Sequence, residues 1–347
     1  MSRVARLGWD IGGAHVKLAA FGDDGRLKDV RIAPCPVWQG EHHLSDAIRT
    51  LRAAFPAGVP SAVTMTAEVA DLWPDRRAGV VGTAAILARE LAGAPLALFA
   101  GPEGFVTAEQ AVAHADAIAS ANWYATAAVL AHLLPEGLLV DIGSTTTDIV
   151  PFSAARVTAG GFTDAERLAR NELIYSGAAR TAVMALAPEA PFEGRWVPLM
   201  AELFATTADI HRLTGELPAD ADLHPTADGG PKTVEASARR LLRMVGQDFR
   251  PDRLPKAVAL ARHLADAQAH RLMRAIDCVA SAQETPQPAL LVGAGVGRFI
   301  ARRLAAGREI PYLDLAEVLT DDPALAGPAA DCAPAVAVGL LSAALAG

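Results

Sequence analysis

The chain has 347 residues, of which 52% are hydrophobic and 20% are charged. This composition excludes a disordered chain and provides apolar material for about two compact domains. The formal net charge of −8 argues against non-specific binding to nucleic acid or to an acidic membrane surface, so a phosphorylated ligand would have to be held by local hydrogen-bond donors and a metal ion.

The cysteines and the N-terminal residues predict a cytoplasmic protein. Cys35, Cys278 and Cys332 are far apart and form no CxxC pair, which fits a reducing compartment and predicts neither a disulfide nor a zinc site. The first residues, MSRVARLGWDIGG, contain no apolar core of a signal peptide. The most apolar long stretch, Gln110–Leu134, contains polar residues, so we expect a buried helix there and not a membrane span.

An internal repeat divides the chain. LGWDIGGAHVKLAAF begins at Leu7, and LVDIGSTTTDIVPF begins at Leu139. Each copy has an apolar run, Asp-Ile-Gly, small polar residues and a second apolar run, which predicts a strand, a tight turn and another strand. Two such hairpins indicate a duplicated domain. We therefore expect one subdomain at 1–136 and a second at 137–347, the second with a helical and loop insertion around 185–250.

Helices and strands are expected to alternate through the rest of the first half. Apolar spacing predicts helices at 44–55, 82–91 and 111–134, and strands at 61–66 and 96–99. Pro135-Glu136-Gly137 then breaks the pattern before the second hairpin.

The second half is longer and more varied. The Pro-, Asp- and Gly-rich residues 217–233 predict an ordered loop over a cleft. Beyond it we expect helices at 234–244, 254–279, 298–304 and 333–346, a strand at 289–292 and a loop at 322–331. Strands that alternate with helices in this way indicate an α/β fold with two sheets.

The two Asp-Ile-Gly turns are the strongest candidates for a ligand site. Their glycines allow successive backbone N–H groups to approach an anion, and the neighbouring hydroxyls add further donors. A carboxylate at the end of each first strand could hold Mg²⁺ through water. The alternative is a duplication with only a structural role. The candidates are Gly12, Gly13, Gly143, Ser144, Thr145 and Thr146 for phosphate, and Asp10 and Asp141 for the metal ion.

A third glycine motif, LLVGAGVGR, begins at Leu290. It lacks the last glycine of a GxGxxG dinucleotide fingerprint, because Arg298 stands at that position. An apolar strand, a GxG turn and a helix, after two Asp-Gly hairpins, resemble the third signature of the sugar kinase, Hsp70 and actin superfamily. The resemblance implies a two-lobed actin-like ATPase (ribonuclease H-like) fold with duplicated βββαβα-type subdomains. It also implies that Gly293 and Gly295 contact a nucleotide.

Several longer blocks resemble a narrower family. They include TMTAEVADLWPDRRAGV, SANWYATA, ELIYSGAARTAV and TADGGPKT. These blocks resemble the hydantoinase/oxoprolinase-like proteins of tetrahydromethanopterin-linked one-carbon metabolism, a group that includes a transferase of methanofuran biosynthesis. The resemblance implies that the phenol oxygen of γ-glutamyltyramine attacks an aminomethylfuran-methyl diphosphate and that diphosphate leaves. Mg²⁺ would assist, ATP could bind without being required, and the resemblance leaves a homodimer open.

That reaction assigns roles to further residues. Lys17, Arg180 and Lys232 are candidate contacts of the diphosphate. The attacking phenol has an unperturbed pKa of about 10, so a carboxylate could assist as general base. Glu68, Asp148 and Glu172 are the candidate catalytic carboxylates, in no order of preference. The structural alternatives are a solvated Lys17, an Asp148 paired with a cation, and a Glu68 that caps the following helix.

Two other classes of function remain open on the sequence. The first is an ATP-dependent small-molecule kinase or a hydantoinase/oxoprolinase-type hydrolase, in which Asp141 and Thr145–Thr147 would position a γ-phosphate and its attacking water. The second is a non-catalytic nucleotide sensor or assembly protein of the actin or Hsp70 sort.

Overall fold

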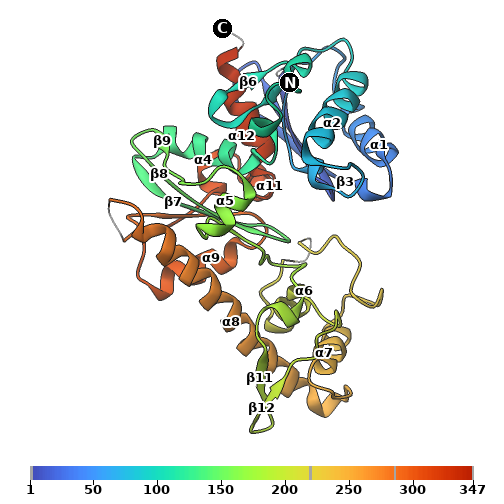
Figure 1. Ribbon diagram of the computed structural model, residues 1–347, viewed down its shortest axis with the longest axis vertical. Coiled ribbons are helices and arrows are strands. Elements are labelled where there is room, and N and C mark those ends of the chain that lie inside the picture. Colours follow the sequence, from blue (N-terminus) through green and yellow to red (C-terminus); the bar gives the residue numbers. More distant parts are fainter. Residues whose placement is uncertain (1–2, 219–220, 285–286, 346–347) are drawn as a thin grey trace. The chain divides into compact units, whose positions relative to one another are not determined.

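The computed structural model describes residues 3–218, 221–284 and 287–345 (Figure 1). These residues form two compact units. Unit 1 contains the described residues of 1–137, 152–164 and 315–347, and unit 2 contains 138–151 and 165–314. The expected division at residue 136 differs from this, because residues 152–164 and the C-terminal helices pack with the first unit.

Unit 1 is built on a six-stranded sheet with the order β3-β2-β1-β4-β5-β6. The first hairpin is antiparallel, whereas β1, β4 and β5 run parallel, so their carboxyl ends lie at one edge. The strands are β1 Val4–Ile11, β2 His15–Gly22, β3 Leu27–Pro34, β4 Ser61–Met65, β5 Leu96–Phe99 and β6 Phe105–Val106.

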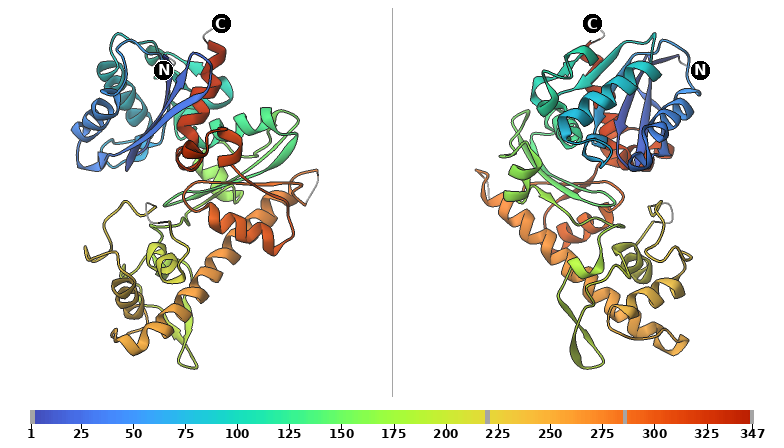
Figure 2. Two further views of the ribbon diagram at one scale, coloured as in Figure 1. Left: turned by 180° about the vertical axis from the view of Figure 1, so that it is seen from behind. Right: turned by 45° about the vertical axis from the view of Figure 1, so that its right-hand side comes forward.

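Helices on this sheet bury a continuous apolar core that includes Leu7, Trp9 and Val63. The C-terminal helix α12 packs on β1, β2 and β4, and Figure 2 shows it in red against the blue strands. The helices of unit 1 are α1 Glu41–Arg52, α2 Arg76–Glu90, α3 Ala115–Ile118, α4 Asn122–Leu133, α10 Ala316–Leu319, α11 Pro323–Asp331 and α12 Ala333–Leu341, and the short strand β9 is Arg156–Val157.

Unit 2 repeats the same plan. Its sheet has the order β10-β8-β7-β13-β14, in which the hairpin β7–β8 corresponds to β1–β2 and the parallel strands β13 and β14 correspond to β4 and β5. The predicted duplication and the actin-like α/β fold are therefore present. The strands are β7 Glu136–Ile142, β8 Thr147–Ser153, β10 Leu173–Ile174, β13 Leu291–Ala294 and β14 Tyr312–Asp314.

The insertion in unit 2 has a core of its own. Ile210, Leu241 and Leu264 belong to this second apolar cluster, which joins α6, α7 and the hairpin β11–β12 to the long helix α8 (Figure 1). The elements of the insertion are β11 Glu189–Phe192, β12 Arg195–Pro198, α6 Thr207–Thr214 and α7 Val234–Arg243, which pack on α8 Leu254–Ser281. Unit 2 also contains α5 Asp164–Ala169 and α9 Arg298–Gly307, and α9 packs on β13 and β14. Short 3-10 helices lie at Val37–Gln39, Ala67–Val69, Gly101–Glu103, Ala108–Gln110, Val183–Ala185, Pro251–Arg253 and Ser342–Leu345.

Three expected elements differ in the structure. The helix predicted over 111–134 is broken into α3 and α4, because Ser120 takes a left-handed backbone with φ 52° and its hydroxyl bonds to a distant carboxylate. The loop predicted at 322–331 is helix α11, which Asp322 caps by accepting from Ala324 N. Helix α2 begins earlier than predicted, since Asp75 caps it through Ala78 N.

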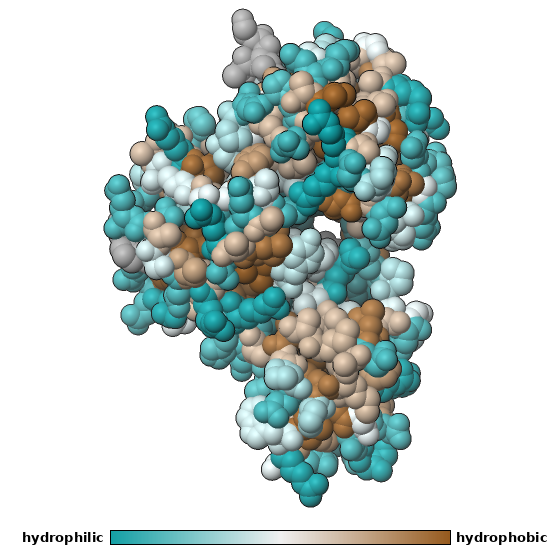
Figure 3. Space-filling view, in the orientation of Figure 1, coloured by the Kyte–Doolittle hydropathy of each residue, from teal (hydrophilic) through white to brown (hydrophobic). Residues whose placement is uncertain are grey.

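Hydrophilic residues cover much of the face shown in Figure 3, with small groups of hydrophobic residues between them. Within the described residues, no single helix has the length and apolar composition to cross a membrane. Among the described residues, one bent pair of helices, α11 and α12, meets that test together, by length and composition alone.

Candidate functional site

The first Asp-Ile-Gly turn places a buried carboxylate beside a lysine. Asp10, near the end of β1, is 5% exposed, and its Oδ2 lies 3.6 Å from Lys17 Nζ on β2. Its Oδ1 is buried and makes no hydrogen bond to the described residues. Burial raises the pKa of Asp10, and Lys17 partly opposes the shift. Lys17 is therefore not merely a solvated strand residue, because it faces the carboxylate.

The C-terminal helix reaches the same carboxylate. Gly8 contacts α12 so closely that a Cβ on it would lie 2.1 Å from Ala335 O. Asp10 is two residues further along β1 and hence on the same face. Cys332, which precedes α12, lies near it: burial raises the pKa of Cys332 to about 12, and the charges of Lys17 and Asp10 also act on this thiol.

Glu68 lies at the neighbouring strand end of the same sheet. It follows β4, which pairs with β1. A hydrogen bond from Thr66 N to Ile11 O extends this pairing by one residue beyond β4. Its Oε1 accepts a 2.7 Å hydrogen bond from Ser120 Oγ, and its buried Oε2 has no partner within the described residues. Burial, opposed mainly by the Ser120 bond, raises the pKa of Glu68 to about 7.

The hairpin hydrogen bonds limit which turn amides remain for a ligand. Gly12 N donates to His15 O at 3.0 Å, and Gly143 N donates to Thr146 O at 2.9 Å. In each turn these first amides close the hairpin. The donors left for an anion are therefore the amides that follow each of these two glycines.

The second turn is supported by a segment from the middle of unit 2. Ala178 N donates to Gly143 O, and Arg180 N donates to Ser144 O at 2.8 Å. Gly177 packs on the turn: a Cβ at this position would lie 2.5 Å from Thr145 N. Only glycine allows this approach, and a single glycine inside ELIYSGAARTAV gives no signal of it in the sequence.

The third glycine motif meets the second turn. Gly295 has φ 75°, and a Cβ on it would lie 2.4 Å from Asp141 Oδ1. Gly297 N donates to Ile142 O at 2.8 Å. Gly293 instead makes room for the Tyr312 ring, since a Cβ there would lie 2.3 Å from its hydroxyl oxygen. Unit 2 thus brings Asp141 and Gly295 together, while the space beside Gly293 is filled by a side chain.

Arg180 lies beside this turn, and Lys232 lies near His224, on which Arg180 also acts. Arg180 Nη1 is 3.4 Å from Thr145 Oγ1, and Lys232 Nζ donates to Asp222 O at 2.5 Å. Both cations act on the half-buried His224, whose pKa is lowered by burial first and then by Arg180, with a smaller effect of Lys232. His224 was missed on the sequence, because a lone histidine in a loop carries no motif.

Asp148 and Glu172 belong to a cluster around a buried arginine. Arg167 is 1% exposed, pairs with Asp148 Oδ1 at 2.8 Å and donates to Glu172 O at 3.0 Å. Glu172 O also accepts from Ile149 N, which joins β10 to β8. Asp148 therefore pairs with a cation, as expected if its role is structural rather than catalytic.

The predicted site residues thus form two groups. Asp10, Gly12, Gly13, Lys17 and Glu68 lie in unit 1. The others lie in unit 2, namely Asp141, Gly143, Ser144, Thr145, Thr146, Asp148, Glu172, Arg180, Lys232, Gly293 and Gly295. The part of the chain that the structure describes contains no group of three or more His, Cys, Asp or Glu side chains suited to hold a metal ion. Any Mg²⁺ would therefore depend on ligand oxygens and water in addition to one or two carboxylates, which is its common mode with phosphates.

Comparison with known proteins places the chain in a family. The model of the hydantoinase/oxoprolinase family matches residues 60–331. The chain belongs to this family. A protein of Methanocaldococcus jannaschii named (4-{4-[2-(gamma-L-glutamylamino)ethyl]phenoxymethyl}furan-2-yl)methanamine synthase is 32% identical over 248 residues, which cover 71% of this chain and 73% of that protein.

Two further similarities are weaker. A protein of Methanococcus vannielii with the same name is 35% identical over 112 residues, or 32% of this chain and 50% of that protein. The crystal structure of component A of the Acidaminococcus fermentans (R)-2-hydroxyglutaryl-CoA dehydratase covers 96% of each chain with 10% identity and a TM-score of 0.46. Both relatives are named as synthases, which are enzymes.

Proposed function

We propose that this protein is a transferase that joins the phenol oxygen of γ-glutamyltyramine, or a close tyramine-type acceptor, to an aminomethylfuran-methyl diphosphate. The new bond is the ether C–O bond, the bond that breaks is the C–O bond to diphosphate, and the phenol proton leaves to a base. The observation that carries this proposal is the 32% identity to the methanamine synthase over 71% of the chain.

Stabilisation of the leaving diphosphate is the main task that we assign to the two turns. A furan-methyl carbon tolerates positive charge, so neutralisation of the departing anion lowers the barrier most. In unit 1 the candidate groups for this role are the amide after Gly12 and the side chain of Lys17. In unit 2 they are the amide after Gly143, the hydroxyls of Ser144, Thr145 and Thr146, and the side chain of Arg180. The buried Oδ1 of Asp10, which has no protein partner among the described residues, fits a carboxylate that completes a magnesium shell. A bound Mg²⁺ would supply electrostatic stabilisation of the diphosphate.

Glu68 is the carboxylate that we propose as general base. A base works best when its pKa lies near the working pH, and the pKa of Glu68 is raised to about 7. Its Oε1 is oriented by Ser120, and Oε2 has no partner within the described residues. Asp148 fits this role less well because it pairs with Arg167.

The test is to incubate the protein with γ-glutamyltyramine, the furan-methyl diphosphate and Mg²⁺, and to measure ether by mass spectrometry and diphosphate release. Equimolar ether and diphosphate are expected, and neither should form when the acceptor is omitted. We expect Glu68→Gln to lower kcat by about 10²–10⁴-fold. Absence of both products with the unmodified protein would overturn the assignment.

An ATP-dependent small-molecule kinase or hydrolase is the second candidate, favoured by the name of the family and by the hydroxyls next to Asp141. It predicts that ATP is consumed in proportion to a small substrate. The transferase predicts the same ether yield with and without ATP.

A further inference from the structure

A chain of buried polar side chains runs through unit 2 and ends at the second turn. His211 on α6, Gln268 on α8 and Ser176 are each 0% exposed. His211 Nε2 lies 2.8 Å from Gln268 Oε1, and Gln268 Nε2 donates to Ser176 Oγ at 3.0 Å and to Gly177 O at 2.9 Å. Buried polar groups of this kind are costly unless each is satisfied. We call His211, Gln268 and Ser176 the buried relay.

The hydrogen-bond inventory fixes the orientation of the relay. A carbonyl oxygen can only accept, so the atom of Gln268 that faces Gly177 O must be its amide nitrogen. Its carbonyl oxygen then faces His211, and His211 Nε2 must carry the proton. The other ring nitrogen, Nδ1, has no hydrogen bond within the described residues and lies 3.8 Å from Glu216 Oε2. That separation is an electrostatic contact rather than a hydrogen bond.

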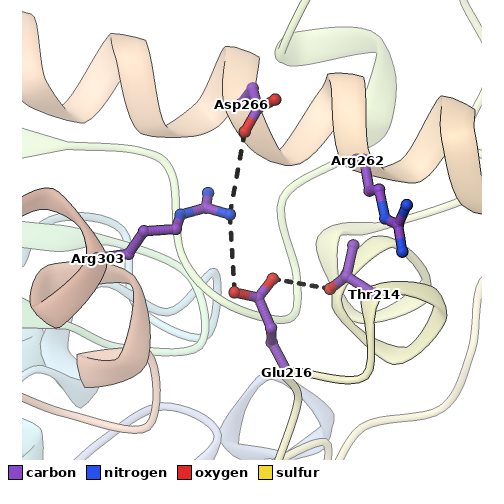
Figure 4. Close-up of a pocket in the computed structure, with 5 residues that line it drawn as sticks. All are labelled: Thr214, Glu216, Arg262, Asp266 and Arg303. Carbon is purple, nitrogen blue, oxygen red and sulfur yellow. Dashed lines mark hydrogen bonds and ion pairs between the residues drawn. The ribbon is translucent and has the colours of Figure 1, made fainter. Parts of the chain in front are cut away.

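His211, at the outer end of the relay, lies next to Glu216, which lines an open cleft. The cleft has a volume of ≈ 390 Å³ and is lined by Thr214, Glu216, Arg262, Asp266 and Arg303 (Figure 4). Glu216 accepts a hydrogen bond from the Thr214 hydroxyl at 2.8 Å and lies 3.6 Å from Arg303. The hydrogen bond from Thr214 and the charge of Arg303 both favour the ionised carboxylate of Glu216. Glu216 is therefore a fixed negative charge next to the buried imidazole at neutral pH.

The inner end of the relay holds the turn itself. Ser176 O accepts from Thr147 Oγ1 at 2.6 Å, and Ala178 N donates to Gly143 O. Gly177 packs directly on the peptide between Ser144 and Thr145. A shift of Ser176 and Gly177 would therefore move the amides that the proposed function assigns to the diphosphate.

We propose that His211 and Gln268 are positioning residues that connect the charge of Glu216 in the cleft to the Gly143–Thr147 turn, and so set the affinity of this turn for a diphosphate group. This inference rests on the proposed function only in taking the turn as a diphosphate site. Neither residue touches the substrate; both act through Ser176 and Gly177.

The experiment compares Gln268→Met with the control His270→Gln, which changes an exposed residue of the same helix. Methionine keeps the volume but leaves Gly177 O without its donor. We expect Gln268→Met to weaken the binding of inorganic diphosphate about tenfold in calorimetry and to raise KM more than it lowers kcat. Amide hydrogen exchange in residues 138–152 should become faster, and the control should match the unmodified protein.

A second pair of variants protects the test against a folding defect. His211→Gln can still donate a hydrogen bond to Gln268, so we expect it to keep most of the affinity for inorganic diphosphate. His211→Leu cannot donate this bond, and we expect it to lose affinity for inorganic diphosphate. Glu216→Gln, at the surface end, is expected to weaken diphosphate binding about fivefold. Unchanged exchange at 138–152 in Gln268→Met would overturn the proposal even if no diphosphate binds. Unmodified protein that binds no diphosphate would instead overturn the proposed function.

Discussion

Gly8 in β1 and Gly339 in α12 lie in backbone contact although they are near opposite ends of the chain. A Cβ on Gly8 would lie 2.8 Å from Gly339 N, and a Cβ on Gly339 would lie 2.2 Å from the Phe21 ring. Arg6 Nε also donates to Gly339 O at 2.8 Å. The C-terminal helix thus packs against the first hairpin. Cys332, just before this helix, lies near the carboxylate of Asp10.

This contact predicts that Gly8→Ala lowers the free energy of unfolding by about 3 kcal/mol, because the added carbon overlaps the α12 backbone and neither element can move freely. Urea unfolding followed by circular dichroism measures the effect. Gly307→Ala is the matched control, since a Cβ there meets nothing within 4 Å. Equal stabilities of the two variants would contradict the close packing.

Asp10→Asn should reduce kcat/KM on the order of 10²-fold, because it removes the negative charge that we assign to holding Mg²⁺. Stability should not fall, since burial already disfavours the charged form of Asp10. Asp46→Asn, on the exposed surface of α1, is the control. The measurements are steady-state kinetics and thermal unfolding, and retained turnover in Asp10→Asn would remove Asp10 from the site.

Glu68 predicts a specific pH dependence of stability. Its pKa is 4.5 without perturbation and about 7 in the folded protein, so between these values the folded state keeps a proton that the unfolded chain has released. The free energy of unfolding should therefore fall as pH rises from about 4.5 to about 7, by up to about 3 kcal/mol. Glu68→Gln should lack this contribution. Denaturant curves at pH 5 and 8 for both proteins give the difference, and parallel pH profiles would be inconsistent with a buried, titrating Glu68.

Gly295→Ala should weaken diphosphate binding about tenfold or more, because the new carbon would press on Asp141 Oδ1 and the backbone at φ 75° disfavours alanine. Calorimetry with inorganic diphosphate is the measurement. Gly104→Ala is a control for the backbone cost alone, since it also has a positive φ, 80°, but no neighbour within 4 Å of its Cβ. If both variants bind alike, contact with Asp141 is not what matters.

Arg167→Met should destabilise the protein by about 3–5 kcal/mol, since it leaves Asp148 without its buried cation and removes a bond to Glu172 O. Arg170→Met, an exposed neighbour, should change stability by less than about 0.5 kcal/mol. Chemical denaturation distinguishes them. A stable Arg167→Met with lost turnover would instead point to a catalytic role for Asp148.

Much of the fold follows from patterns that are local in the sequence. The two Asp-Ile-Gly hairpins were predicted from an apolar run, a turn and a second apolar run, and both form antiparallel pairs in the structure. The third glycine motif was predicted as strand, turn and helix, and β13 and α9 have this arrangement. Arg298 excluded a dinucleotide fingerprint, and in the structure it donates to Gly295 O at 3.0 Å. Such features depend on neighbouring residues, whose preferences the sequence displays directly.

Other features depend on contacts between distant segments, and these the sequence did not reveal. The near-neutral pKa of Glu68 results from burial and from Ser120, which breaks a helix that its composition would continue. The return of α12 to β1, and the chain from Glu216 through His211 and Gln268 to the second turn, join residues with no shared motif. The sequence alone therefore determined which turns this protein forms. Only tertiary packing decided which carboxylate has a pKa near 7 and which contacts hold each turn in place. The physical reason is that burial and hydrogen bonding depend on all the groups around a residue.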